Sequence, residues 1–240
     1  MMYKHDFGDG KGPVPAHQHP NGGGWVADTA SVADTAYVGL LATVRDSATV
    51  SGSAVVCDTA VVRDSATVCD YARVSGSTVV RDSAVVCDSA RVLASAEVSG
   101  AAVVRDSAEV RDQAEVRDYG VVRDAAAVSG SAVVRDFATV CDSATVCDYA
   151  WVSSSAVVCD YAAVRDSALV RDSALVRDSA QVRDSALVSG VATVRDSAVV
   201  RDSAVVRDRA EVRDSAVVRD SAFVGGCRVV AGSEAVGDRD

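Results

Sequence analysis

The sequence has few of the residues from which globular cores and catalytic centres are usually built. Aromatic residues make up only 5% of the 240 residues, and the chain has 3 histidines and 2 methionines. A globular core needs bulky side chains of varied shape, whereas this chain offers chiefly valine and alanine. Its core must therefore be narrow and uniform along its length.

Long apolar runs and a basic surface are missing as well. No apolar run approaches the ~20 residues of a membrane span, and the opening MMYKHDFGDG lacks the apolar stretch of a secretory signal. The formal net charge of −10 disfavours binding to nucleic acid or to an anionic membrane surface. We therefore expect a cytoplasmic protein with neither nucleic acid nor membrane among its partners.

The 7 cysteines do not form the disulfide framework of a small secreted protein. Six of them occupy the one position that Arg or Ser holds in most other units, and a single base change converts an Arg codon to a Cys codon. Drift within an expanded DNA repeat explains this distribution. Two pairs are 18 residues apart and are expected to stack, with a Cα spacing that permits a disulfide, although reduced thiols are expected in the cytosol: Cys69 with Cys87, and Cys141 with Cys159.

What the chain does have is a six-residue repeat of the type S-A-V-V-R-D. Valine occupies every sixth position from Val26 to Val236, which makes 36 consecutive valines without a slip of register. From Ala30 to Ala222, alanine stands two positions before each of these valines, with Thr78 and Gly120 as the only substitutes. A fixed short period of this kind is the signature of a repeat architecture.

The pattern within the repeat predicts a short strand followed by a corner. In A-x-V the Ala and Val share one side of the strand, and the residue between them points to the other side. Two positions after the valine stands Asp in 26 units and Gly in 7 of the 36, and both residues tolerate left-handed backbone conformations. The corner therefore comes in two versions, R-D and S-G, which we expect to be interchangeable. Representative turn positions are Asp46, Gly52, Asp64, Gly76 and Asp106.

Three strands and three corners make an 18-residue triangular coil. The outward residues support this period, because positions 18 apart sort into three faces of different kind. One face is apolar from residue 133 onward, one carries valine, leucine and threonine, and one is mixed and partly charged. The repeats predict about twelve coils, and at ~4.8 Å per rung the rod is roughly 55–60 Å long.

The unit Val-Arg-Asp-Ser-Ala-Val-Val resembles the hexapeptide repeat of left-handed parallel β-helices, over residues 25–236. The stretch HPNGGGWVADTA is similar to the opening of uncharacterised hexapeptide-repeat proteins of bacteria and phages. The resemblance implies an all-β fold, a left-handed parallel β-helix. It does not imply one function, since acyltransferases, γ-class carbonic anhydrases, ice-binding proteins and structural modules share this fold. One departure is the position after the valine, which is mostly Arg here.

The chain divides into three parts on this interpretation. Residues 1–24 are expected to form an irregular cap over the first rung, residues 25–224 the repeat β-helix, and residues 225–240 a degenerate C-terminal cap. Arg228 and Glu234 stand where alanine should point inward, and charge at that position stops further stacking.

Catalysis and cofactor binding are not expected. Acyltransferases of the resembled fold typically use a histidine near a loop extruded between coils, and γ-class carbonic anhydrases need three histidines on zinc. Here the valine register is unbroken and the repeats contain no histidine, so we predict no catalytic residue and no cofactor. Ice binding needs regular ranks of threonine on a flat face, whereas the threonines here are scattered over all three faces.

Two metal sites remain alternatives. His5, His17 and His19 are weak candidates for a transition metal, with solvated loop histidines as the other interpretation. The stacked Asp residues of the corners offer oxygen ligands for Ca²⁺, but adjacent Arg residues balance them, so we expect ion-pair ladders instead.

The most distinctive surface is an apolar column on one face, with residues 18 apart: Val133, Trp151, Leu169, Leu187, Val205 and Phe223. A continuous apolar stripe marks an interface. We therefore expect a non-enzymatic structural or interaction rod that forms a homodimer, or alternatively a homotrimer. The competing interpretation is a bacterial or phage binding protein that captures a small ligand or a host protein on an oligomeric surface.

Overall fold

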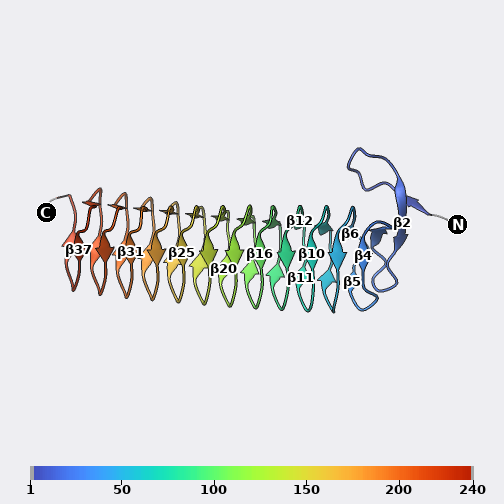
Figure 1. Cartoon of the computed structure of the whole chain (residues 1–240), viewed down its shortest axis with the longest axis horizontal. Coiled ribbons are helices and arrows are strands. Elements are labelled where there is room, and N and C mark those ends of the chain that lie inside the picture. Colours follow the sequence, from blue (N-terminus) through green and yellow to red (C-terminus); the bar gives the residue numbers. More distant parts are fainter. Residues whose placement is uncertain (1–2, 239–240) are drawn as a thin grey trace.

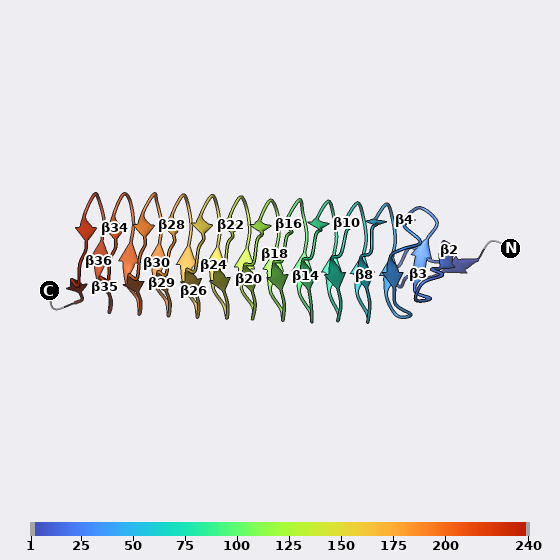
Figure 2. The ribbon, with the colours of Figure 1, turned by 90° about the horizontal axis from the view of Figure 1, so that it is seen from below.

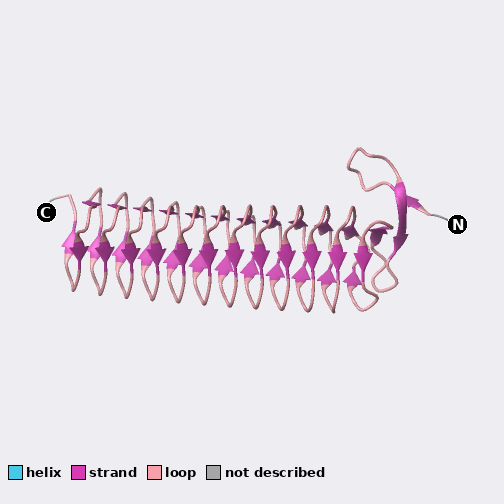
Figure 3. Cartoon of the chain, in the orientation of Figure 1, coloured by secondary structure: helices cyan, strands magenta, loops and turns pink. Residues whose placement is uncertain are grey.

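The computed structural model describes residues 3–238, and this part of the chain is a straight rod of strands and turns without any helix (Figures 1 and 3). The strands form three sheets of 14, 12 and 12 strands that run along the rod. Most strands have two residues, and each coil contributes one strand to each sheet.

The first sheet contains β1 (Lys4–His5), β2 (Val14–Gln18), β3 (Trp25–Ala27), β6 (Thr43–Val44), β9 (Val61–Val62), β12 (Val79–Val80), β15 (Glu97–Val98), β18 (Glu115–Val116), β21 (Val133–Val134), β24 (Trp151–Val152), β27 (Leu169–Val170), β30 (Leu187–Val188), β33 (Val205–Val206) and β36 (Phe223–Val224). The second contains β4 (Ser31–Val32), β7 (Thr49–Val50), β10 (Thr67–Val68), β13 (Val85–Val86), β16 (Val103–Val104), β19 (Val121–Val122), β22 (Thr139–Val140), β25 (Val157–Val158), β28 (Leu175–Val176), β31 (Thr193–Val194), β34 (Glu211–Val212) and β37 (Val229–Val230). The third contains β5 (Tyr37–Val38), β8 (Val55–Val56), β11 (Arg73–Val74), β14 (Arg91–Val92), β17 (Glu109–Val110), β20 (Ala127–Val128), β23 (Thr145–Val146), β26 (Ala163–Val164), β29 (Gln181–Val182), β32 (Val199–Val200), β35 (Val217–Val218) and β38 (Ala235–Val236).

From β3 onward, each strand pairs in parallel with the strand one coil later, so that partners in the sequence are 18 residues apart. Val133 pairs with Trp151, for example, and Arg73 with Arg91. The all-β class, the three-sided coil of 18 residues and the number of about twelve coils are therefore confirmed, and the protein is a parallel β-solenoid. The three kinds of outward residue predicted from the sequence lie on three different sheets.

The core is a single column of valine and alanine inside the coils. The inward valines from Val38 to Val230 are completely buried, and nearly all inward alanines between them are as well. Thr78 replaces one inward alanine and is also completely buried, but its Oγ1 has no hydrogen-bond partner among the described residues. Because every coil buries nearly the same side chains, its stability depends mainly on the coils above and below it.

The corners have the left-handed backbone that the sequence predicts. From Asp46 to Asp220 the corner aspartates have φ values between 58° and 64°. Their side chains add a contact that the sequence did not predict: the carboxylate accepts a backbone N–H from the corner one coil later. Asp124 N–H donates to Asp106 Oδ2 (3.2 Å), and Gly130 N–H donates to Asp112 Oδ2 (3.1 Å). These bonds offset the repulsion between stacked carboxylates.

The glycine corners do not accept a side chain without a shift of the next coil, which limits the expected interchange of the two versions in one direction. Gly130 shares the left-handed conformation (φ 68°), but a Cβ at this position would lie 2.7 Å from Asp148 N and 2.8 Å from Asp148 Cα. Gly52, Gly100 and Gly190 are equally close to the following coil. Glycine corners therefore allow a closer approach of the next coil, which an aspartate at the same position would prevent.

The N-terminal segment is more regular than its prolines and glycines indicated. β1 and β2 form an antiparallel hairpin, and β2 pairs antiparallel with β3, which covers the edge of the first sheet (Figures 1 and 2). Residues 19–24 cover the edge of the third sheet, where Val38 N–H donates to Asn21 O (3.0 Å) and Gly24 N–H to Val38 O (2.9 Å). Residues 3–24 thus contain two regular strands, which pairing with open strand edges orders.

At the other end, the coil continues through residues 225–236. β37 and β38 pair in register with β34 and β35. Arg228 and Glu234 are exposed on this last coil and form an ion pair of 3.0 Å. No helix within residues 3–238 is long and apolar enough to cross a membrane.

Candidate functional sites

The apolar column predicted from the sequence lies on the outer surface of the first sheet. Its six residues are direct neighbours across five successive strand pairs: Val133, Trp151, Leu169, Leu187, Val205 and Phe223. On the N-terminal side the column ends at Glu115, which pairs with Val133. Phe223 and Trp151 are 52% and 41% exposed, Val133 is buried (7%), and the other three residues are half-buried.

Arginines from the preceding coils lie over both aromatic residues of the column. The guanidinium carbon of Arg135 is 5.2 Å from the ring centroid of Trp151, and that of Arg207 is 4.6 Å from the ring centroid of Phe223. A cation over an aromatic face is attracted by the ring, and the methylene groups of the arginine side chain cover apolar surface. The column is therefore less exposed than its sequence indicated, with a positive charge beside each aromatic residue.

The other two faces differ from this one. The outward residues of the second sheet from Val85 to Thr193 are half-buried valine, leucine and threonine without an aromatic residue. The third sheet carries Arg73 and Arg91 in register, followed by Glu109. The first sheet is thus the face with a continuous apolar column that includes large exposed aromatic side chains.

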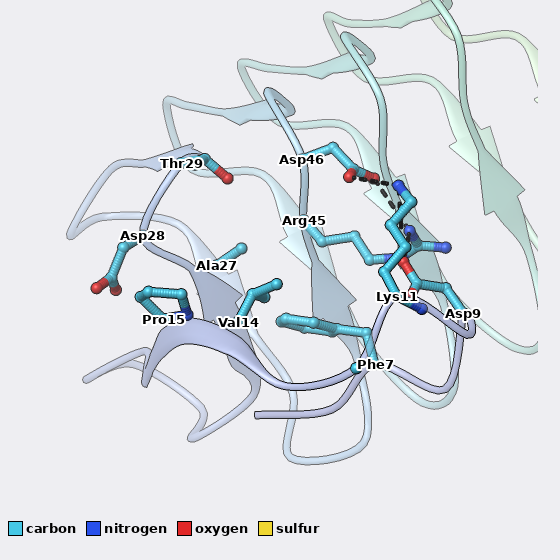
Figure 4. Close-up of a pocket in the computed structure, with 11 residues that line it drawn as sticks. Phe7, Asp9, Lys11, Val14, Pro15, Ala27, Asp28, Thr29, Arg45 and Asp46 are labelled. Atoms are coloured by element: carbon cyan, nitrogen blue, oxygen red, sulfur yellow. Dashed lines mark hydrogen bonds and ion pairs between the residues drawn. The ribbon is translucent and has the colours of Figure 1, made fainter. Parts of the chain in front are cut away.

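A cavity of about 440 Å³ lies between the loop of residues 6–13 and the first coils (Figure 4). Phe7, Val14 and Pro15 form part of its apolar wall. At its rim Arg45 contacts Asp9 (2.8 Å) and Asp46 (3.0 Å), and Lys11 contacts Asp46 (3.2 Å).

The charges at this rim are already balanced by one another. Lys11 N–H donates to Asp9 Oδ1 (3.0 Å), and this bond, together with the nearby Arg45 and Lys11, lowers the pKa of the Asp9 carboxyl. The repeat pattern did not predict this cavity, because part of its wall comes from residues 7–15, which lie outside the repeat.

The three histidines have separate surroundings. The His5 ring stacks on Trp25, with 4.2 Å between ring centroids, and His17 Nδ1 lies 2.9 Å from Asp28 Oδ1. His19 is 3% exposed, its Nδ1 lies 3.1 Å from the carbonyl oxygen of Asn21, and its Nε2 has no partner among the described residues. The geometry therefore gives each imidazole a different neighbour.

The corner charges pair mainly within one coil. Arg63 contacts Asp64 at 2.7 Å and Arg123 contacts Asp124 at 2.6 Å, with all four side chains about one-third exposed. Pairs between coils also occur, as between Arg81 and Glu97 (2.6 Å). Exposed pairs of this kind contribute little to stability, so the Asp carboxylates matter more as acceptors of backbone N–H groups.

The stacked cysteines form no disulfide, and each lies beside the aspartate that follows it. Cys141 Sγ lies 3.3 Å from Asp142 Oδ2, and Cys159 Sγ lies 3.6 Å from Asp160 Oδ2. Burial and the neighbouring carboxylates raise the pKa of the Cys141 thiol to about 11 and that of Cys159 to about 12. The same causes raise the pKa of Cys69 to about 12 and that of Cys87 to about 11.

Comparison of this chain with protein-family models, with curated proteins and with solved structures finds no match. The function is therefore inferred from the surfaces and side chains described above.

Proposed function

We propose that this chain is a non-enzymatic structural or interaction rod that self-associates through the apolar column of its first sheet. The observation that carries the proposal is the column itself, six side chains in register on a straight wall. At ~4.8 Å per rung, their five gaps extend over about 24 Å. A continuous apolar patch on a regular surface is typical of a protein interface, whereas single exposed apolar residues are common on any surface.

A two-fold pair of antiparallel rods fits this column best. Two-fold symmetry is the commonest in homo-oligomers, and an axis between Leu169 and Leu187 brings these two residues of one rod against the same two of the other. The same axis sets Trp151 opposite Val205, so that each exposed aromatic ring meets an aliphatic side chain. A homotrimer, which is usual for enzymes of the resembled fold, is the alternative assembly.

The repeat supports assignment to the left-handed hexapeptide-repeat superfamily, and the stretch HPNGGGWVADTA supports a bacterial or phage origin. The net charge of −10 supports a protein that binds neither nucleic acid nor an anionic membrane surface. The continuous repeat, with all three histidines outside it, supports a role without catalysis and without a cofactor.

The N-terminal cavity favours a second function, capture of a small ligand. Its apolar wall with a few polar groups at the rim is typical of small-molecule sites, and its paired charges suit a neutral, largely apolar molecule. Native mass spectrometry of protein purified from its own host tests this function. A bound small molecule that is lost in Phe7→Ala supports it, and an unliganded mass contradicts it.

Leu169→Lys combined with Leu187→Lys tests self-association. Two lysines at the centre of the column bring four like charges together across a two-fold interface, so we expect a folded monomer in sedimentation velocity. The matched control is Val103→Lys with Val121→Lys, two outward residues that are in register on the second sheet. The control should sediment as the unmodified protein does, and equal dissociation of both variants contradicts the assignment of the interface.

A further inference from the structure

One corner of the rod carries an uninterrupted column of nine aspartates, from Asp70 to Asp214, at 18-residue spacing. In five of these coils an arginine precedes the aspartate, and in the other four a cysteine does. The four cysteines occur as two stacked pairs, Cys69 with Cys87 and Cys141 with Cys159. At each pair, two neighbouring carboxylates lack the arginine that the rest of the column provides, and two thiols take its place.

At the second pair the side chains converge. Cys141 Sγ, Cys159 Sγ and a carboxylate oxygen of Asp142 all lie within 4.8 Å of one another. Cys141 is almost completely buried (3% exposed) and Cys159 is half-buried. Asp142 is held in place by Asp160 N–H, which donates to its Oδ2 (3.3 Å). Two sulfur donors and one oxygen donor on neighbouring coils thus surround a common point.

We propose that Cys141, Cys159 and Asp142 bind one divalent ion of borderline softness, with Zn²⁺ as the physiological candidate. Zinc accepts thiolate sulfur at about 2.3 Å and carboxylate oxygen at about 2.0–2.2 Å in tetrahedral sites. Donor atoms within 4.8 Å of one another reach such a centre by small side-chain rotations. Water or the carboxylate of Asp160 completes the fourth position. Calcium is not suited to this site, because it takes six to eight oxygen ligands.

The binding reaction balances without an oxidant or reductant. Two S–H bonds break, two zinc–sulfur bonds form, and the two protons leave to solvent. The ion therefore replaces two protons with an equal charge beside Asp142 and Asp160. Because both thiols lose a proton when they bind the ion, the affinity for zinc should increase as the pH rises.

The other stacked pair provides an internal comparison. Cys69 and Cys87 also precede aspartates on neighbouring coils. Within residues 3–238, however, three metal-ligating side chains come close together at one place only, which is formed by Cys141, Asp142 and Cys159. We therefore expect a single tight site in the chain, and not one site for each pair of cysteines.

The test uses the full chain under reducing conditions, with Zn²⁺ in competition with a chromophoric chelator and Co²⁺ as a spectroscopic probe. We expect one equivalent of bound zinc and a thiolate-to-cobalt charge-transfer band, both retained in Cys69→Ser with Cys87→Ser. Both should be lost in Cys141→Ser with Cys159→Ser. Loss in the first double variant, or retention in the second, would overturn the site.

Asp142→Asn separates a metal ligand from a bystander. Asparagine keeps an oxygen acceptor for Asp160 N–H and tolerates the left-handed backbone, so the corner should stay folded by circular dichroism. We expect the zinc affinity to fall at least tenfold while the cobalt band remains. Unchanged affinity would overturn the assignment of Asp142, and absence of any cobalt band in the unmodified protein would overturn the site as a whole.

Discussion

Inward and outward residues of the same strands differ in burial and in the range of residue types that they include. In β19, Val122 points inward and is completely buried, whereas its neighbour Val121 points outward and is half-buried. The inward position is valine in every coil, and the outward position ranges from Trp151 to Arg73 and Glu109. The inward residues thus specify the solenoid, and the outward residues are free to distinguish one face from another.

The largest effect is expected from breaking the inward column. Val122→Asp places a charge without a partner in a core that has no room for water, so it should lower the free energy of unfolding by more than about 3 kcal/mol. The matched variant Val121→Asp places the same side chain on the outer surface and should cost less than about 1 kcal/mol. Urea unfolding followed by circular dichroism measures both. Similar losses would show that the strand does not separate two environments.

Corner substitutions come next and test the difference between the two corner types. Gly130→Asp pushes a Cβ against the backbone of Asp148, and the next coil must shift, so we expect a loss of about 1–3 kcal/mol. Arg123→Ser with Asp124→Gly removes an exposed ion pair and the acceptor of Asp142 N–H (3.3 Å), which should cost about 1 kcal/mol. The same unfolding measurements rank them, and a neutral Gly130→Asp would restore the interchangeable corner.

Much of this fold could be predicted because the repeat is regular. The alternation in A-x-V gives the inward column, and the 18-residue grouping of outward residues gives three sheets. The carboxylate bond from Asp106 to the next coil could not be predicted, since it depends on the rise between coils and on a side-chain rotamer. The hairpin of residues 4–18 lies outside the repeat, so the periodicity of the sequence could not predict it.

On the surfaces, too, the features that follow from the 18-residue period could be predicted, and those that depend on side-chain conformation could not. The apolar column was visible in the sequence, because residues 18 apart are neighbours in any such coil. The cover of Trp151 by Arg135 was not visible, because a long side chain can lie in several directions. Likewise, the stacking of Cys141 and Cys159 followed from spacing, whereas the approach of Asp142 to both sulfurs required the side-chain positions.

A smaller effect of opposite sign is expected at the one polar inward residue of the middle coils. Thr78 buries a hydroxyl that has no partner among the described residues, and such a group costs about 1–3 kcal/mol when left unsatisfied. Thr78→Ala restores the alanine of the repeat but also removes a methyl group. We therefore expect the free energy of unfolding to increase by about 1 kcal/mol, which thermal unfolding measures. Destabilisation would mean that the hydroxyl has a partner, such as an internal water.

Calcium should have no effect on stability. The corner carboxylates accept backbone N–H groups and most of them have a neighbouring arginine, as Asp106 does with Asp124 N–H and Arg105, so they offer no vacant oxygen cage. The melting temperature should be the same in millimolar calcium and in a calcium-selective chelator. A marked increase with calcium would show that the ion binds between the aspartates and would replace the present account of the corners.

The mass of the unmodified protein in solution tests the central claim most directly. Light scattering at micromolar concentration should give about twice the chain mass of 24.6 kDa, because the apolar column of one rod is covered by that of another. A trimer mass would keep the interface and change its symmetry. A mass of 24.6 kDa at all concentrations would contradict self-association.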